Sequence, residues 1–246
     1  MKILYYLAGI GGPNYDVKIN ILVNNINSLY DEIKEPIDMI INMYEYNEDL
    51  IKLIKENKKI GESYINLRKG VLVELWKKNG FNNLVKKYDY VLFIYDDVKI
   101  KKYSVKENIE KLKRLKLDIL SPLVEKATHP FMKIGRKEEI KIMNSLEIYF
   151  ILMKPETFYK YLDIQDIENK WTWGTDFLFG YYKIKCGINC NNIVLHNYPQ
   201  KNRECLGDAY RGMIKYLNKL GFKNLSEVIE KYPPLIKIIK YIKEKG

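Results

Sequence analysis

Apolar residues in the first hundred positions occur either in continuous blocks or at helical spacing. Lys2–Ala8 is a continuous block, 36–46 is a second, and YDYVLFIYDDVKI at 88–100 contains a third. Between the first two, residues 17–29 place their apolar side chains on one face of a helix. Continuous β-branched and aromatic blocks are typical of strands that a parallel sheet buries on both faces. The alternation predicts an α/β fold with a mostly parallel central sheet and helices on both sides.

The alternation of strands and helices continues to about residue 199. A polar loop and two final helices follow it. The last predicted helix, PPLIKIIKYIKEKG, has apolar residues on one face and lysines on the other. Such a helix is expected to pack on the core, with contact to an anionic membrane as the alternative. The other predicted helices are 48–57, 70–80, 105–115 and 155–162, with a break at Gly61, and the other strands are 117–123, 146–154 and 191–199.

The chain has 246 residues and no linker or internal repeat that would divide it. We therefore expect a single domain, residues 1–246. Its core is expected over about residues 1–200 and a helical extension over about residues 201–246.

The net charge of +11 comes almost entirely from lysine, because the chain has only five arginines. Lysines and acids are interspersed along the chain rather than gathered in basic blocks. Arginine is the preferred side chain for recognition of phosphates and base edges, so the composition argues against a nucleic-acid partner.

The three cysteines, Cys186, Cys190 and Cys205, are an odd number and lack the paired spacing of a zinc site. We interpret them as reduced thiols, which indicates a cytoplasmic protein with at most a peripheral membrane contact. The apolar start, MKILYYLAGIGG, is too short for a membrane span and is predicted to be a strand.

Candidate chemistry begins with Asp96 and Asp97, which follow the apolar block 91–94. The carboxyl ends of strands form the ligand-binding edge of open α/β sheets. Two adjacent carboxylates repel each other unless a cation, a proton or solvent separates them. The pair is interpreted either as a divalent-metal site or as a solvated turn, in which Asp is common.

A second candidate is Asp176, the single acid in the aromatic segment WTWGTDFLFGYY at 171–182. A carboxylate beside Trp173 and Phe177 would be partly desolvated, which raises its pKa and suits it to accept a proton. The rings also offer stacking faces for a sugar or a base. The alternative is a helix cap after Gly174, because Asp is a frequent capping residue.

Other polar residues have two interpretations each. His196 ends the apolar run 193–195 and, taken alone, is best explained as a hydrogen-bonded structural histidine. Arg68 and Lys69 precede a predicted helix, where they are either solvated or contacts of a diphosphate.

In their order along the chain these segments resemble the GT-A class of nucleotide-sugar glycosyltransferases. The resemblance covers residues 2–199: a first β–α unit, a variant of the Asp-x-Asp motif at a strand end, an acid after a glycine, and a late histidine. More narrowly, YDYVLFIYDDV, WTWGTDFLFGYY and IVLHNYP are similar to segments of a little-characterised GT-A-like family of plants and bacteria. The resemblance implies a Rossmann-type α/β/α sandwich with a mostly parallel central sheet and carboxyl-terminal helices.

The resemblance also implies roles for individual residues. Asp97 matches the last acid of the Asp-x-Asp motif, which binds Mn²⁺ or Mg²⁺, and His196 matches the late histidine that coordinates the same ion. Asp176 matches the base that deprotonates the acceptor hydroxyl in inverting members. Its neighbours Trp173 and Gly174 are expected to contact the donor.

The chain departs from the Asp-x-Asp motif at Tyr95, which stands where the first acid is expected. Tyrosine can stack on a nucleoside or hydrogen-bond to it, but it is a poor ligand for a hard cation. Asp96 is expected to compensate by reaching the ribose or a metal-bound water.

Together these features predict an inverting, metal-dependent glycosyltransferase. A divalent cation neutralises the charge that develops on the departing diphosphate, and a separate carboxylate accepts the proton of the attacking hydroxyl. The expected donor is a UDP-sugar, with a GDP-sugar as second choice, and the acceptor is a glycan or another hydroxyl compound.

The rival hypothesis is a sugar nucleotidyltransferase. Those enzymes open with a Leu-Ala-Gly and glycine-rich loop similar to LAGIGG. In the glycosyltransferase hypothesis the backbone of the same stretch, at Ala8, Gly9 and Gly11, is expected to approach the nucleotide of the donor. Here the loop continues with PNYDVKI and lacks the arginine that would contact the triphosphate. A non-catalytic carbohydrate- or nucleotide-binding module is a further alternative, which would retain the tryptophans and lose the metal site.

Overall fold

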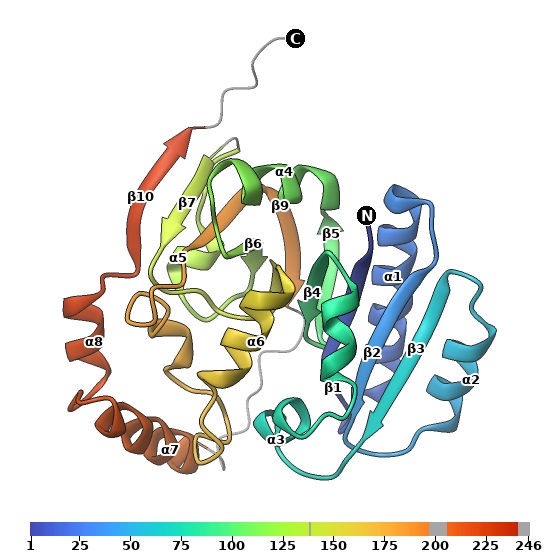
Figure 1. Cartoon of the computed structure of the whole chain (residues 1–246), viewed down its shortest axis with the longest axis horizontal. Helices are drawn as coiled ribbons and strands as arrows, with labels where there is room; N and C mark the ends of the chain where they lie inside the picture. The colour runs from blue at the N-terminus through green and yellow to red at the C-terminus, as the bar shows by residue number, and fades with distance from the viewer. Residues whose placement is uncertain (138, 197–205, 241–246) are drawn as a thin grey trace.

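The computed structural model describes residues 1–137, 139–196 and 206–240 of the chain. Within these residues a ten-stranded mixed sheet lies at the centre of the molecule, with helices on both faces (Figure 1). The α/β/α architecture expected from the sequence is thereby confirmed. The strands are β1 (Ile3–Ile10), β2 (Ile37–Met43), β3 (Ile60–Leu67), β4 (Tyr90–Ile94), β5 (Val98–Lys102), β6 (Ile119–Glu125), β7 (Glu139–Met143), β8 (Phe150–Met153), β9 (Cys186–His196) and β10 (Leu235–Lys240).

The first half of the sheet is parallel. β1 lies between β4 and β2, and β3 pairs with the outer side of β2. Every residue of β1 and β4 is buried, as expected for continuous apolar blocks that helices cover on both faces. Parallel pairing brings the carboxyl ends of these strands to one edge of the sheet.

Antiparallel pairings connect the second half of the sheet to the first. β8 is antiparallel to both β4 and β6, so the amino end of β8 lies beside the carboxyl end of β4. β9 inserts between β6, to which it is parallel, and β7, and its far end also pairs with β5. The sheet order is β10-β7-β9-β6-β8-β4-β1-β2-β3.

Two sets of helices cover the faces of the sheet. On one face α1 packs against β5 and α4. On the other face Trp76 of α3 packs edge-on against Phe93 and also contacts Tyr161 of α6. The helices are α1 (Tyr15–Ile33), α2 (Glu48–Glu56), α3 (Leu72–Lys77), α4 (Val105–Arg114), α5 (Pro130–Lys133), α6 (Pro155–Asp163), α7 (Leu206–Lys219) and α8 (Leu225–Lys231), with 3₁₀ turns η1 (Asn82–Lys87) and η2 (Thr175–Phe177).

The carboxyl-terminal helices form a small hydrophobic cluster with the aromatic segment around η2. Phe177 and Leu178 are buried against Met213 and Leu217 of α7 and Val228 of α8. The helices that the sequence predicts as an extension therefore support the segment that contains Asp176.

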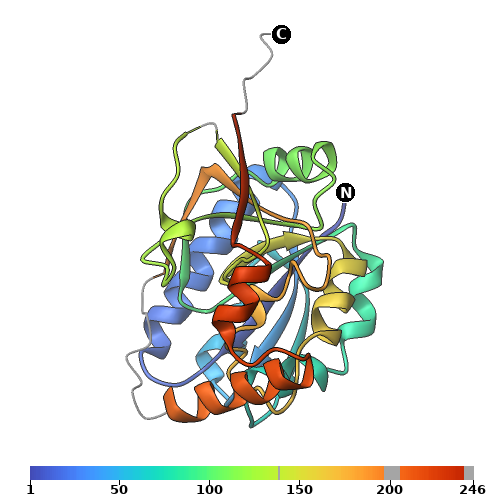
Figure 2. The same ribbon diagram turned by 90° about the vertical axis from the view of Figure 1, so that its left-hand side faces the viewer.

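The last described segment differs from the sequence prediction. Residues 235–240 form β10, an antiparallel partner of β7, rather than an amphipathic helix. Three isoleucines in six residues favour extended backbone, and the edge of β7 provides hydrogen bonds along the strand. β10 lies at the left edge of the molecule in Figure 1 and faces the viewer in Figure 2. The amphipathic helix, expected to pack on the core with membrane contact as the alternative, does not form over 235–240, and 241–246 lie outside the described residues.

None of the helices within the described residues has the length and apolar character needed to cross a membrane.

Three shorter differences arise inside the chain. β5 follows Asp97 directly, although the sequence analysis predicted no strand there, and the predicted strand 146–154 begins only at Phe150. Gly61 lies within β3 instead of breaking the chain, because its missing side chain leaves room for the Asp38 carboxylate. Asp176 lies in a 3₁₀ turn whose N-cap is Gly174, so it does not cap a longer helix.

Candidate functional site

Asp96 and Asp97 lie in the tight turn that joins β4 to β5, at the carboxyl edge of the parallel strands. The backbone N–H of Tyr95 donates to the carbonyl of Tyr149 at 3.0 Å, which fastens the segment before β8 beside this turn. Both carboxylates therefore lie where open α/β sheets bind ligands.

Asp97 is paired with His196 across the antiparallel strands β5 and β9. The register of these strands sets Val98 opposite His196, and the distance from Asp97 Oδ2 to His196 Nε2 is 3.0 Å. Only 12% of the Asp97 side chain and 7% of the His196 side chain are exposed. The other two polar atoms, Asp97 Oδ1 and His196 Nδ1, are buried without a hydrogen-bond partner among the described residues.

This pair fits part of a divalent-cation site. A buried carboxylate oxygen without a protein partner, beside an imidazole nitrogen, is a donor set that Mn²⁺ or Mg²⁺ accepts. Among the described residues no group of three or more His, Cys, Asp or Glu side chains converges to hold a metal. A metal bound by Asp97 and His196 would therefore need further ligands from a bound molecule or from water.

Asp96 contacts α1. Its Oδ2 lies 2.9 Å from Lys18 Nζ, which also donates to the carbonyl of Gly11 at 2.5 Å. Burial raises the pKa of Asp96 to about 6, although the nearby Lys18 charge lowers it. Asp96 is thus tied to the first loop, and its expected contact with ribose or a metal-bound water stays a prediction.

Ala8 and Gly9 lie at the end of β1 and only Gly11 lies in the loop after it, whereas the sequence analysis placed Gly9 in that loop. Aromatic side chains of the protein contact this stretch. The carbonyl of Ala8 accepts a hydrogen bond from Trp76 Nε1 at 2.7 Å. A Cβ on Gly9 or Gly11 would come within 3.0 Å of the Tyr44 side chain. The half-buried ring of Tyr44 therefore lies against this loop, and the expected nucleotide contacts of Ala8, Gly9 and Gly11 stay predictions.

The other residues expected to contact the donor, Tyr95, Arg68 and Lys69, lie in different parts of the structure. The Tyr95 ring packs edge-on against Trp76 and Tyr149, with ring centres 6.3 and 6.0 Å away. Arg68 and Lys69 are exposed in the loop between β3 and α3, where the Arg68 guanidinium approaches the Lys78 carbonyl at 3.5 Å. Within the described part of the chain, neither basic side chain makes a hydrogen bond or ion pair with Asp97 or His196.

Asp176 lies next to a second acid, Glu147. The backbone N–H of Leu146 donates to the carbonyl of Asp176 at 3.0 Å, which joins η2 to the segment before β8. Burial raises the pKa of Asp176 to about 8, and the charge of Glu147 acts in the same direction. Burial also raises the pKa of Glu147. The local chemistry favours a protonated acid in this pair at neutral pH, as in other close carboxylate pairs.

His129 lies against both acids. Its Nε2 is 3.8 Å from Glu147 Oε1 and 3.8 Å from Asp176 Oδ2. The three side chains come from the segments before α5, before β8 and in η2. Trp173, two residues before η2, is 40% exposed, so it lies open to a ligand in the solvent.

Tyr149 connects the acid pair to the proposed metal ligands. Its ring stacks on His196 with a centre-to-centre distance of 4.2 Å, and its hydroxyl donates to Glu147 Oε1 at 3.5 Å. The structure thus brings Asp97, His196 and Asp176 into one continuous polar cluster.

The sequence analysis gave no role to Glu147, His129, Tyr149 or Lys18. Glu147 had a usable signal, because it is an acid at the border of an apolar run, as Asp97 is. Its place near the other candidate residues depends on the antiparallel pairing of β8, and the periodicity of the sequence does not specify that pairing.

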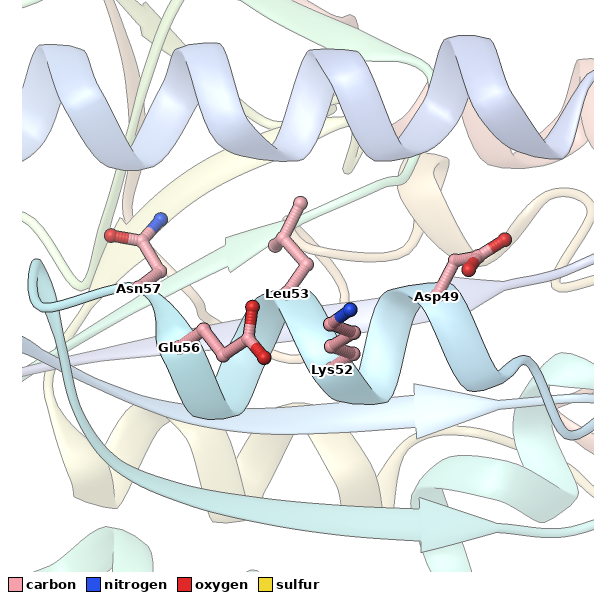
Figure 3. Close-up of a pocket in the computed structure, with 5 residues that line it drawn as sticks. All are labelled: Asp49, Lys52, Leu53, Glu56 and Asn57. Atoms are coloured by element: carbon pink, nitrogen blue, oxygen red, sulfur yellow. The ribbon is translucent and has the colours of Figure 1, made fainter.

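An open surface pocket lies elsewhere, beside α2. It has a volume of about 380 Å³ and is lined by one side of α2 (Figure 3). Its lining includes none of the candidate residues, and Asp49, Lys52 and Glu56 are ordinary solvated helix positions.

Comparisons with known proteins bear on the fold. Neither protein-family models nor curated protein sequences match this chain. Among solved structures, one of GalNAc-T7 with UDP, GalNAc and Mn²⁺ aligns with 89% of this chain and 48% of its own, at 8% identity and a TM-score of 0.62. TarS of S. aureus, residues 1–349 in complex with UDP-GlcNAc, aligns with 93% of this chain and 69% of its own, at 9% identity and a TM-score of 0.59.

A longer TarS structure gives a TM-score of 0.60 at 11% identity, over 93% of this chain and 41% of that one. At such low identity these likenesses show the fold alone, which is that of the GT-A glycosyltransferases. The chain spans about half the length of the GalNAc-T7 chain.

Proposed function

We propose that the protein is a metal-dependent glycosyltransferase that moves a sugar from a nucleoside-diphosphate sugar to an acceptor hydroxyl with inversion. The main support is the pair Asp97–His196, which leaves a buried carboxylate oxygen without a partner at the ligand-binding edge of a GT-A fold. An unpaired buried polar atom costs about 1–3 kcal/mol of stability, so a ligand that satisfies it is a reasonable cause for its presence.

Each residue has a role in this proposal. Asp97 and His196 would hold Mn²⁺ or Mg²⁺, which supplies neutralisation of the charge on the departing diphosphate. Asp176 would accept the proton of the acceptor hydroxyl as its oxygen attacks the anomeric carbon. Trp173, which is exposed three residues before Asp176 in the chain, would offer a stacking face for a sugar.

The donor base is proposed from the fold relatives. The GalNAc-T7 structure contains UDP and the TarS structure contains UDP-GlcNAc, which supports UDP ahead of GDP for this chain. The acceptor side contains two carboxylates with raised pKa values, Asp176 and Glu147, which suit hydrogen bonds from the hydroxyls of a neutral glycan or alcohol.

Thermal-shift measurements with UDP and GDP, each with Mn²⁺ or with EDTA, test this proposal. A ligand at a hundred times its dissociation constant adds about 2.7 kcal/mol to stability, or about 5 to 10 °C for a chain of this size. We expect that shift with UDP and Mn²⁺ together and little with either alone. Absence of a metal-dependent shift with both nucleotides would contradict the proposed metal site.

Turnover distinguishes an enzyme from a binding module. We expect release of the nucleoside diphosphate from one member of a panel of UDP- and GDP-sugars, with water as a slow acceptor. Release of pyrophosphate from a nucleoside triphosphate and a sugar phosphate would instead identify a nucleotidyltransferase.

A further inference from the structure

His129 lies where a proton could leave the buried acid pair. Its Nε2 is equally distant from Asp176 Oδ2 and Glu147 Oε1, at 3.8 Å. About 32% of the His129 side chain is exposed, compared with 17% for Asp176 and 7% for Glu147. The imidazole therefore has one nitrogen toward both acids and an exposed part of its ring toward solvent.

The protein holds this ring in a defined orientation. Phe131 stacks on it with an interplanar angle of 3° and a centre-to-centre distance of 5.3 Å, and Phe177 packs edge-on at 4.9 Å. The backbone N–H of His129 donates to Glu147 Oε2 at 3.4 Å. The separations from Nε2 to the acids exceed a hydrogen bond, and a small carboxylate rotation or one water closes them.

Burial, together with one nearby positive charge, favours the neutral form of His129. It faces Asp176 from η2, Glu147 from the segment before β8, and Lys133 from α5. Burial lowers the pKa of His129 below its usual value of 6.5, and the charge of Lys133 acts in the same direction. At neutral pH a ring nitrogen of His129 is then free to accept a proton.

We propose that His129 is a proton relay that returns Asp176 to its basic form after each transfer, an inference that rests on the proposed function. The acceptor hydroxyl loses its proton to an Asp176 carboxylate oxygen as its own oxygen forms a bond to the anomeric carbon. The bond between that carbon and the diphosphate oxygen breaks at the same time, and its electron pair stays on the diphosphate. The proton then passes from Asp176 to Nε2 of neutral His129. The imidazolium releases a proton to water, which restores both side chains.

The test follows the release of nucleoside diphosphate from the best UDP- or GDP-sugar of the panel, between pH 6 and 9. We compare wild type with His129→Gln, which cannot titrate, and with Phe131→Leu, which loosens the same ring without removing a titrating group. His129→Gln should lower kcat about tenfold or more at neutral pH with unchanged KM for the donor. Added imidazole should restore much of the rate to His129→Ala, and Phe131→Leu should lose less than His129→Gln.

Two results would overturn the relay: a kcat of His129→Gln within twofold of wild type at every pH, or an equal loss in Phe131→Leu without imidazole rescue of His129→Ala. Unchanged melting temperatures of the variants separate these results from misfolding. If the wild-type chain releases nucleoside diphosphate from none of the donors, the proposed function itself is contradicted, and the relay with it. An active wild type beside an equally active His129→Gln removes the relay alone.

Discussion

The carboxylates of Asp97 and Asp176 are expected to lower the stability of the folded chain, because each is largely removed from water. Their position at the candidate site gives a functional reason for their presence. Asp97 has a buried oxygen without a partner among the described residues, and Asp176 lies beside Glu147. Hydrophobic residues of similar size would cost less at these positions. Functional sites commonly retain such groups at the expense of stability.

Asp97→Asn should remove metal-dependent nucleotide binding with little loss of fold. Asparagine keeps the size of the side chain but is a weaker ligand for a hard cation. Calorimetry with UDP and Mn²⁺ measures the binding. The control is Asp118→Asn, the same change at an acid outside the candidate site. Unchanged Mn²⁺-dependent binding in Asp97→Asn would exclude Asp97 as a ligand.

Asp176→Asn should reduce transfer by roughly 10²- to 10⁴-fold while nucleotide and metal binding survive. Asparagine keeps the size of the carboxyl group but cannot accept the proton. Wild-type turnover should also rise with pH up to about 8, because burial raises the pKa of Asp176 to about 8 and only the ionised form is a base. Initial rates with the identified donor measure both effects. Near-normal turnover of the variant would defeat the assignment, and a product that retains the anomeric configuration would defeat inversion.

At this scale the sequence pointed to those candidate residues that border apolar blocks. Asp97 and Asp176 follow apolar or aromatic runs, and His196 ends one. Glu147 and His129 were missed because their proximity to Asp176 depends on strand pairing and loop packing between distant segments. Local pattern contains no information about such contacts.

At the scale of elements, α1 holds the turn between β4 and β5. Lys18 binds Asp96, and seven residues later the buried Asn25 bonds to β5. Asn25 Nδ2 donates to the carbonyl of Val98 at 2.7 Å, and its Oδ1 accepts from the N–H of Ile100 at 2.8 Å. One side chain thus satisfies two backbone groups immediately after Asp97, as a neighbouring strand would.

Asn25→Ala should destabilise the protein by about 2–4 kcal/mol, because it leaves two buried backbone groups of β5 unpaired. Asn24→Ala is the matched control, since Asn24 is an exposed neighbour on the same helix, and it should change stability by no more than about 0.5 kcal/mol. Urea unfolding measures both. Equal small effects would show that β5 does not depend on Asn25.

Elements with strong local patterns were predicted well, and β10 was predicted wrongly. β1, β2 and β4 and the helix α1 follow directly from continuous and helically spaced apolar residues, whereas β3, with its break predicted at Gly61, does not. LIKIIK fits a helix face and an edge strand almost equally, and the free edge of β7 decides between them. β5 was missed because a five-residue strand after a turn gives too short a pattern.

For the molecule as a whole, the raised pKa of Asp176 predicts how stability depends on pH. The folded chain binds this proton up to about pH 8, whereas an unfolded Asp loses it near its ordinary pKa of 3.8. The resulting stabilisation is complete below about pH 4 and is lost as pH rises through about 8. Asp176→Asn should therefore gain roughly 2 to 4 kcal/mol relative to wild type between pH 5 and pH 8.

Asp166→Asn is the control for that measurement. The pKa of Asp166 is lowered, with the hydrogen bond from Lys219 as the main favourable contact against the opposing effect of burial. Its contribution to stability is lost only as pH falls through that lowered pKa, so the Asp166→Asn effect should be the same at pH 5 and pH 8. Urea unfolding at both pH values gives the comparison, and a parallel response of the two variants would contradict the assignment for Asp176.

The position of β9 has a consequence for folding. Asp97 and His196 are 99 residues apart in sequence, and they meet only when β9 has entered between β6 and β7 and reached β5. Such non-local pairings form late and slowly compared with helices and neighbouring strands. A partly folded chain without β9 lacks the pair Asp97–His196 that is proposed to hold the metal. Affinity for nucleotide and metal should therefore disappear at the same urea concentration at which the sheet unfolds. The site in this way acts as a probe of complete folding, because only the fully assembled sheet creates it.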